Sequence, residues 1–147
     1  MLNRDFDCLT VNGVCDLSHK DIIAGSPLTQ NADGTFRLAK SGDAFVGLSF
    51  NYYFEGKNDV TGGEWFADSG KLAIVKIAQV TLAADEIDGV KVSPFVLTDN
   101  FVPGHKVVVN ADGKLAAADS DAADAVATVV AFDAQKGELT LFVNAQN

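Results

Sequence analysis

The stretch Val107–Ala118 reads VVVNADGKLAAA, and its Asn-Ala-Asp-Gly tetrapeptide recurs in TQNADGTFRLAK at Thr29–Lys40. The order Asn-x-Asp-Gly is typical of a type I turn followed by a glycine in the left-handed region, which closes a β-hairpin with a G1 bulge. Short apolar stretches flank both copies. We therefore predict two β-hairpins, with Gly34 and Gly113 at positive φ.

The similarity between the two copies extends beyond the tetrapeptide. Three further blocks match in the same order: AGSPLTQ with PGHKVVV (24–30 and 103–109), DAFVG with DAVAT (43–47 and 124–128), and GKLAIVKI with GELTLFVN (70–77 and 137–144). Chance explains one shared tetrapeptide easily, but not four ordered blocks. The pattern therefore indicates an internal duplication.

Each repeat is predicted to run strand, tight turn, strand, loop, strand, loop, strand. In the second repeat, residues 125–143 are predicted to form a further hairpin with Leu139, Leu141 and Val143 on one face, and between the repeats residues 78–97 are predicted to form a strand pair around Asp88-Gly89. No window shows a clean helical stripe with caps, and AAADSDAADAVA is the only candidate for one short helical turn. We predict an all-β chain of two tandem, related, small antiparallel β-barrel or sandwich-like halves. The expected parts are an N-terminal arm or hairpin (1–23), a first half (24–82), a connecting strand pair (83–102) and a second half (103–147), all of which could form one compact domain.

The repeats differ most at residues 51–69, NYYFEGKNDVTGGEWFADS, which hold both tyrosines and the only tryptophan. Large aromatic residues in a Gly-rich insertion are either a lid on the core or an exposed anchor for a partner. The second repeat manages without the insertion, which favours the contact role. The candidate interface residues are Tyr52, Tyr53, Phe54, Trp65 and Phe66, together with Phe6 and Leu9 of the arm.

The two cysteines, Cys8 and Cys15, flank the sequence TVNGV. A two-residue hairpin turn at Asn12-Gly13 would pair Val11 with Val14. The two thiols would then share a sheet face without being directly opposed. This arrangement favours reduced, half-buried thiols over a strained disulfide.

Composition excludes several classes of protein. The net charge is −9, from 11 basic and 20 acidic residues, whereas a nucleic-acid surface requires clustered Lys and Arg. No apolar run approaches the roughly 18 residues of a membrane span. The N-terminus, MLNRDFDCLTVNGVC, lacks the uninterrupted apolar region of a signal peptide. We expect a soluble, acidic protein that binds neither nucleic acid nor membrane.

The repeated tetrapeptide also matches positions 3, 5 and 6 of an EF-hand calcium loop. Position 1 would be Thr29 or Val108, and position 12 would be Lys40 or Asp119, so the first carboxylate and the final glutamate are both missing. A plain turn is favoured. The three aspartates within residues 119–124 could hold a hard cation, but a solvated loop is the favoured interpretation, and no metal is expected.

Catalytic patterns are weak. His19 and His105 belong to no Gly-x-Ser-x-Gly or His-Glu-x-x-His arrangement. Glu55, Glu64 and Glu86 could in principle pair as glycosidase carboxylates, although the chain offers little sugar-binding platform. We expect no catalytic residue and no cofactor.

The residues VPGHKVVVNADGKLAAADSDAADAVATVVAFDAQKGELTLFV (102–143) resemble the small β modules of capsid decoration, or cement, proteins of tailed bacteriophages. The shared plan is a Gly-led strand, an Asp-Gly turn, an apolar strand, an Ala/Asp-rich loop and a closing hydrophobic strand. AGSPLTQNADGTFRLAKSGDAFVGLSF (24–50) resembles the same plan. Residues 51–69 and about the first twenty depart from it.

This resemblance implies a non-enzymatic virion protein made in the host cytoplasm. Such a protein binds the major capsid protein on the outer surface of the head and stabilises contacts between its subunits, often as a trimer or dimer. Two alternatives remain open from the sequence. One is a head-fibre or adhesin-type module that binds glycans through Tyr52, Tyr53 and Trp65, and the other is a small carboxylate-dependent hydrolase.

Overall fold

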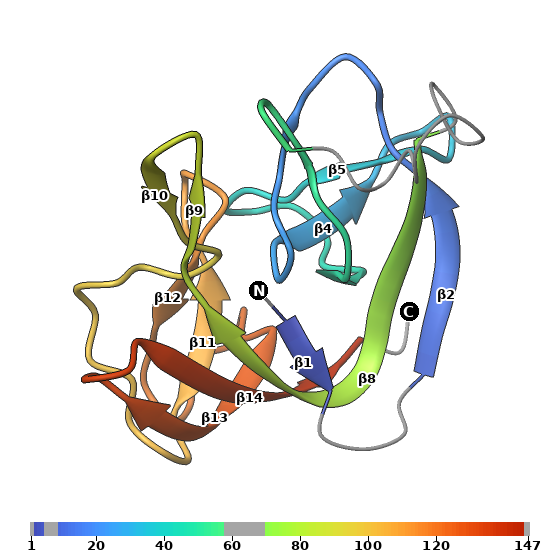
Figure 1. Cartoon of the computed structure of the whole chain (residues 1–147). Helices are drawn as coiled ribbons and strands as arrows, with labels where there is room; N and C mark the ends of the chain where they lie inside the picture. Colours follow the sequence, from blue (N-terminus) through green and yellow to red (C-terminus); the bar gives the residue numbers. More distant parts are fainter. Residues whose placement is uncertain (1, 5–8, 58–69, 146–147) are drawn as a thin grey trace.

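The computed structural model describes residues 2–4 (main chain only), 9–57 and 70–145. These residues form β-strands and connecting loops and contain no helix, which confirms the all-β prediction (Figure 1). The strands are β1 (Leu2–Arg4), β2 (Leu9–Val14), β3 (Asp21–Ile22), β4 (Pro27–Gln30), β5 (Phe36–Leu38), β6 (Gly47–Ser49), β7 (Tyr53–Phe54), β8 (Lys71–Ala83), β9 (Asp85–Ile87), β10 (Val90–Val92), β11 (Lys106–Val109), β12 (Leu115–Ala117), β13 (Ala127–Asp133) and β14 (Glu138–Asn144).

One curled, half-barrel sheet dominates the structure. Its strands follow the order β12-β11-β13-β14-β8-β6-β4-β5, and β1 and β2 also pair with β8. Two small additions complete it, the β9–β10 hairpin and the β3–β7 pair. The hairpin turns at Asp88-Gly89, as the sequence predicts for the connecting strand pair.

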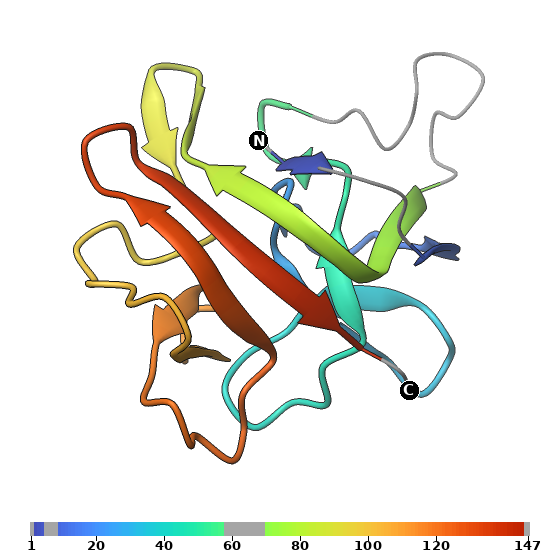
Figure 2. The same ribbon diagram turned by 90° about the horizontal axis from the view of Figure 1, so that it is seen from below.

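Strand β8 is the centre of the sheet. Its first part, residues 71–77, pairs with β2 and β6, whereas its last part, residues 77–83, pairs with β14 and β1. Figure 2 shows β8 and β14 lying side by side across the molecule. The single long strand therefore joins the N-terminal and C-terminal parts of the chain.

The same antiparallel pairings occur on both sides of the β8–β14 pair. On one side β4 pairs with β5 and β6, and β6 pairs with β8; on the other, β11 pairs with β12 and β13, and β13 pairs with β14. Loop hydrogen bonds match as well. The Gly25 amide donates to the Ser49 carbonyl at 2.7 Å, and the Gly104 amide donates to the Val129 carbonyl at 2.9 Å.

The register corrects one of the matched sequence blocks. Gly47 lies opposite Leu28, and Ala127 lies opposite Val107. Gly47 therefore occupies the position of Ala127, not of Thr128 as the sequence alignment predicts. The loop between the turn and this strand is therefore one residue longer in the second repeat than in the first, not two residues longer as the sequence alignment predicts.

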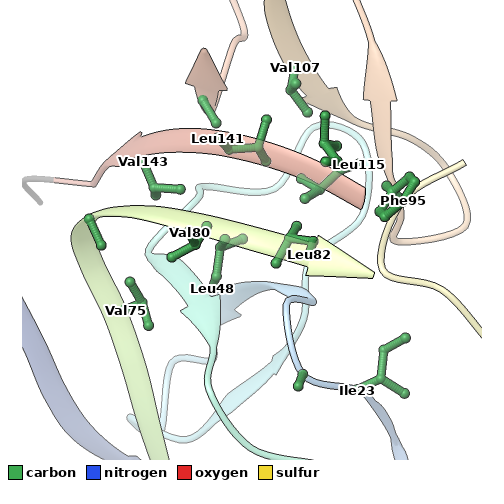
Figure 3. Packing of buried hydrophobic residues seen from close by; sticks show 14 of the residues in the cluster. Ile23, Leu48, Val75, Val80, Leu82, Phe95, Val107, Leu115, Leu141 and Val143 are labelled. Atoms are coloured by element: carbon green, nitrogen blue, oxygen red, sulfur yellow. The ribbon is translucent and has the colours of Figure 1, made fainter. Parts of the chain in front are cut away.

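The core lies on the concave side of the curled sheet and under its covering loops. Figure 3 shows Leu141, Val143, Val80 and Leu82 converging from β14 and β8. The predicted alternation of Leu139, Leu141 and Val143 on one face is confirmed, since all three are fully buried. A second, smaller cluster fills the N-terminal side: Cys15, Ile22, Leu28, Leu38, Tyr53, Leu72 and Ile74.

The predicted hairpin turn at Asn12-Gly13 is wrong. Both residues lie within β2, which pairs with β8 along its length. A Cβ atom at Gly13 would lie 2.5 Å from Cε2 of Phe36, so the glycine allows the aromatic ring to approach the strand closely. Beyond β2, Cys15 is a free and buried thiol whose pKa burial raises to about 12. Its predicted relation to Cys8 lies outside the described residues.

Candidate functional site

The tyrosines of the predicted interface are core residues in this structure. Tyr52 is 7% exposed and Tyr53 is 4% exposed. The Tyr52 hydroxyl donates to the Asp85 carboxylate, and the Lys57 ammonium lies 3.7 Å from the centroid of the Tyr52 ring. The Tyr53 hydroxyl donates to the Leu17 carbonyl at 3.2 Å. For these two residues, the burial agrees with the lid interpretation of the insertion and leaves little of either ring for a partner.

The other candidate interface residues divide into two groups. Phe54 is half-buried and packs against the larger core cluster, whereas Leu9 is 52% exposed on β2. Trp65, Phe66 and Phe6 lie outside the described residues. An interface that includes any of these residues stays a prediction.

The first Asn-Ala-Asp-Gly turn is held by side chains at the surface. Asp33 Oδ1 accepts hydrogen bonds from the Thr35 amide at 2.9 Å and the Thr35 hydroxyl at 2.6 Å, and these bonds hold the Asp33 pKa below its usual value. The Asn31 side-chain Nδ2 donates to Asp16 Oδ2 at 3.1 Å. The turn is thus tied to the loop after β2, while Gly34 itself is exposed.

Arg37 connects this turn to the next loop. Its Nε donates to Asn31 Oδ1 at 2.9 Å, and its Nη1 lies 2.9 Å from Asp43 Oδ2. The same Asp43 oxygen accepts a hydrogen bond from the Lys40 amide. The bonds from Arg37 and Lys40 lower the Asp43 pKa, because both favour the ionised carboxylate.

The second turn lies against the first part of the chain. Asn110 Oδ1 accepts hydrogen bonds from the Asp112 and Lys114 amides at 2.9 Å, and the Asn110 carbonyl accepts one from the Ser41 amide at 3.0 Å. Gly113 is buried, and a Cβ atom added there would lie 2.5 Å from Leu38 Cδ2. This turn is therefore a packing contact as well as a hairpin end.

A hollow of about 490 Å³ lies where these two regions meet. Its charged lining groups are Lys40, Asp43 and Asp124, and Phe45, Val109 and Val126 supply apolar surface. Lys40 and Asp124 are exposed, and Asp43 is engaged by Arg37. The residues that line the hollow include no arrangement of a nucleophile, base and orienting group.

The weaker catalytic and metal candidates are spread over the surface. Glu55 and Glu86 are exposed, as are the aspartates at 119, 121 and 124, and Glu64 lies outside the described residues. His19 is exposed and His105 is half-buried. Within the described ranges, no three His, Cys, Asp or Glu side chains come together as a metal site. The stretch AAADSDAADAVA forms turns, a loop and parts of two strands rather than a helical turn.

Sequence reasoning missed the exposed apolar edge at β2. Leu9, Val11 and Val14 are 52%, 39% and 45% exposed, and Leu17 just beyond the strand is 47% exposed. From the sequence, this stretch was predicted to form a hairpin with its turn at Asn12-Gly13, rather than one strand. The alternative signal was the run LTVNGV without a charged residue, which is typical of a strand.

Comparison with known proteins identifies no family. No model of a known protein family matches the chain, and none of the curated proteins is significantly similar to it. In the described part of the chain, no helix has the length and apolar character to cross a membrane. Function is therefore argued from the residues and contacts above.

Proposed function

We propose that the chain is a structural virion protein that binds the outer surface of a bacteriophage capsid as a decoration, or cement, protein. The observation that carries this proposal is the resemblance at residues 102–143, together with the four strands β11, β12, β13 and β14 that these residues form in succession along the chain. The predicted sequence plan, from the Gly-led strand to the closing hydrophobic strand, matches the order of these elements. No catalytic role is part of the proposal.

The proposal includes an architecture of two tandem related halves. The matched pairings on either side of β8–β14 support it, as do the equivalent loop bonds at Gly25 and Gly104. Strand β8 would end the first half, and its last part would join the halves by pairing with β14 of the second. Residues 51–69 would be an insertion in the first half, and residues 1–23 an arm.

The proposed partner is the major capsid protein, and the proposed state is a homo-oligomer, either a dimer or a trimer. The net charge of −9 suits a protein displayed on the outside of a particle, because like-charged particles resist association. Attachment would combine contacts that are individually weak, since many copies bind one shell.

The test is binding to shells assembled from the major capsid protein of the genome that encodes this chain. Purified protein is mixed with expanded and unexpanded shells and sedimented, and the bound protein is quantified. Saturable binding to the outside of expanded shells, with an increased resistance of the shells to heat, is the expected result. Absence of the protein from the sedimented shells at concentrations well above the site concentration would contradict the proposal.

A further inference from the structure

We propose that Asp88-Gly89, at the end of the β9–β10 hairpin, is the site at which the folded chain converts aspartate to isoaspartate. This covalent modification needs no enzyme, and it is independent of the proposed capsid binding. The dipeptide Asp-Gly occurs three times in the chain, at 33–34, 88–89 and 112–113. The surroundings of the three copies differ, and the difference predicts which of them reacts.

The reaction joins the amide nitrogen of the glycine to the side-chain carboxyl carbon of the aspartate. A C–N bond forms, and the amide hydrogen leaves with the carboxyl OH as water, which gives a succinimide ring. Water then opens the ring at either of its two carbonyl carbons. Opening at Cγ restores aspartate, whereas opening at the main-chain carbon leaves the peptide bond on the side-chain carboxyl, and the product is isoaspartate. Glycine favours this step because it has no Cβ to hinder its own nitrogen.

The glycine amides of the first and third copies are held by their turns. The Gly34 amide donates to the Asn31 carbonyl at 3.0 Å, and the Gly113 amide donates to the Asn110 carbonyl at 3.2 Å. Each bond closes its turn. The nitrogen can therefore attack a side chain only after the turn opens locally, which costs free energy.

Further contacts restrain the same two copies. Asp33 Oδ1 accepts hydrogen bonds from the amide and the hydroxyl of Thr35, so the carboxylate is held away from the glycine nitrogen that follows it. Gly113 is buried, and a Cβ atom added there would lie 2.5 Å from Leu38 Cδ2. The backbone rotation that ring closure requires is therefore opposed by packing at the third copy.

Asp88-Gly89 has none of these restraints. Both residues are exposed, and no atom lies within 4 Å of a Cβ added at Gly89. Among the described residues, the Gly89 amide donates no main-chain hydrogen bond, and the Asp88 carboxylate accepts no hydrogen bond and forms no ion pair. The hairpin is closed instead by Ile87 and Val90, which lie opposite each other. Both reacting groups are therefore available while the hairpin stays paired.

The backbone of this turn adds to its reactivity. Asp88 and Gly89 have φ values of 51° and 78°, as a two-residue type I′ turn requires. Asp88 is the one non-glycine residue of the described chain with a positive φ, a conformation that is unfavourable for an L-residue. Its carboxylate lies beside Gly56, which has no side chain to hold it. The hairpin projects from the body of the molecule (Figures 1 and 2), so the turn can distort without disturbing the core.

The test is the slow ageing of the purified full chain at physiological temperature and pH. One sample is kept in native buffer and a second in urea above the unfolding transition. Peptide mapping with electron-transfer fragmentation then quantifies isoaspartate at residues 33, 88 and 112. The native sample should contain several-fold more isoaspartate at residue 88 than at either other site. In urea the three sites should become similar, because the folded contacts that distinguish them are lost.

A matched pair of variants, Asp88→Asn and Asp112→Asn, tests the same difference more rapidly. Asparagine tolerates a positive φ, and an Asn-Gly pair closes the same ring with ammonia as the leaving group. Hydrolysis then leaves a carboxylate, so ion-exchange chromatography separates the product from the unreacted variant. The native Asp88→Asn variant should deamidate several-fold faster at the introduced amide than the native Asp112→Asn variant. Circular dichroism verifies that both are folded.

Three results would overturn the inference. One is equal or greater isoaspartate at residue 33 or 112 in the native sample. Another is the same preference for residue 88 in urea, which would assign the selectivity to the neighbouring sequence rather than to the fold. The third is deamidation of Asp88→Asn that is no faster than that of Asp112→Asn. Because no shell is present, these outcomes are independent of capsid binding.

Discussion

The two Asn-Ala-Asp-Gly turns have the same sequence and the same backbone role but different surroundings. Gly34 and Gly113 have φ values of 91° and 79°, as the turn requires. Gly34 is exposed, and the nearest atom to an added Cβ would be Gln30 Nε2 at 3.9 Å. Gly113 instead packs against Leu38 and Ala39. The turn type is thus a local property of the tetrapeptide, whereas its contribution to packing depends on the position in the fold.

The comparison predicts its largest effect at Gly113. Gly113→Val should lower the free energy of unfolding by about 2–5 kcal/mol, from left-handed strain of about 1–2 kcal/mol and overpacking of about 1–3 kcal/mol. The overpacking arises because the new Cβ would lie 2.5 Å from Leu38 Cδ2 and 3.0 Å from the Ala39 carbonyl oxygen. Urea unfolding followed by circular dichroism measures the change. A loss below about 1 kcal/mol would show that this turn is not packed as described.

Gly34→Val is the matched variant and should cost less, about 1–2 kcal/mol, because it adds backbone strain without a clash. The same unfolding measurement applies. The informative quantity is the difference between the two variants, since the residue replaced, the residue introduced and the turn are the same. Equal losses for Gly34 and Gly113 would contradict the assignment of the second turn to a buried contact.

The third prediction concerns the loops that follow the two hairpins, because only the first of them has an aspartate paired with an arginine. Asp43, in the first loop, accepts from Arg37 and from the Lys40 amide, while the corresponding stretch after the second hairpin is Ala122-Ala123. Asp43→Asn should lower the free energy of unfolding by about 0.5–1 kcal/mol at neutral pH, since the ion pair is partly exposed. Thermal or urea unfolding at several pH values provides the measurement.

The pH dependence of that loss has a definite sign. The folded-state pKa of Asp43 is lowered, so its contribution is complete above the ordinary carboxyl pKa and is lost as the pH falls through the folded-state pKa. Wild type and Asp43→Asn should therefore converge in stability at acidic pH. A difference that is independent of pH would show that the ion pair with Arg37 does not cause it.

The sequence predicted the hairpins and turns, because these depend on residues that are close together in the chain. Both Asp-Gly hairpins, the β13–β14 hairpin and the turn at Asp88-Gly89 are local features with strong turn residues. The pairing of β8 with β14 joins residues about sixty positions apart, and no local pattern specifies it. Gly13 was misinterpreted because a glycine serves close packing as well as turns, and only the position of Phe36 distinguishes the two.

The candidate interface was predictable only in part for a related reason. Aromatic residues in an insertion have the same sequence pattern whether they cover a core or contact a partner. The burial of Tyr52 and Tyr53 follows from tertiary contacts with Lys57, Asp85 and Leu17. The exposed edge of β2 was not predicted, because the incorrect hairpin at Asn12-Gly13 divided this strand into two shorter ones that paired with each other.

The smallest expected effect concerns the second loop, whose aspartates 119, 121 and 124 are exposed. A bound cation would stabilise the folded state by an amount that rises with its concentration, so its removal would lower the melting temperature. If the three carboxylates are only solvated, no bound cation stabilises the folded state, and a chelator has no ion to remove. We expect EDTA to leave the melting temperature unchanged, with the Asp124→Asn variant as a control for a change in loop charge alone. A decrease of several degrees that calcium reverses in the wild type, but not in Asp124→Asn, would identify this loop as a cation site and separate it functionally from the loop held by Arg37.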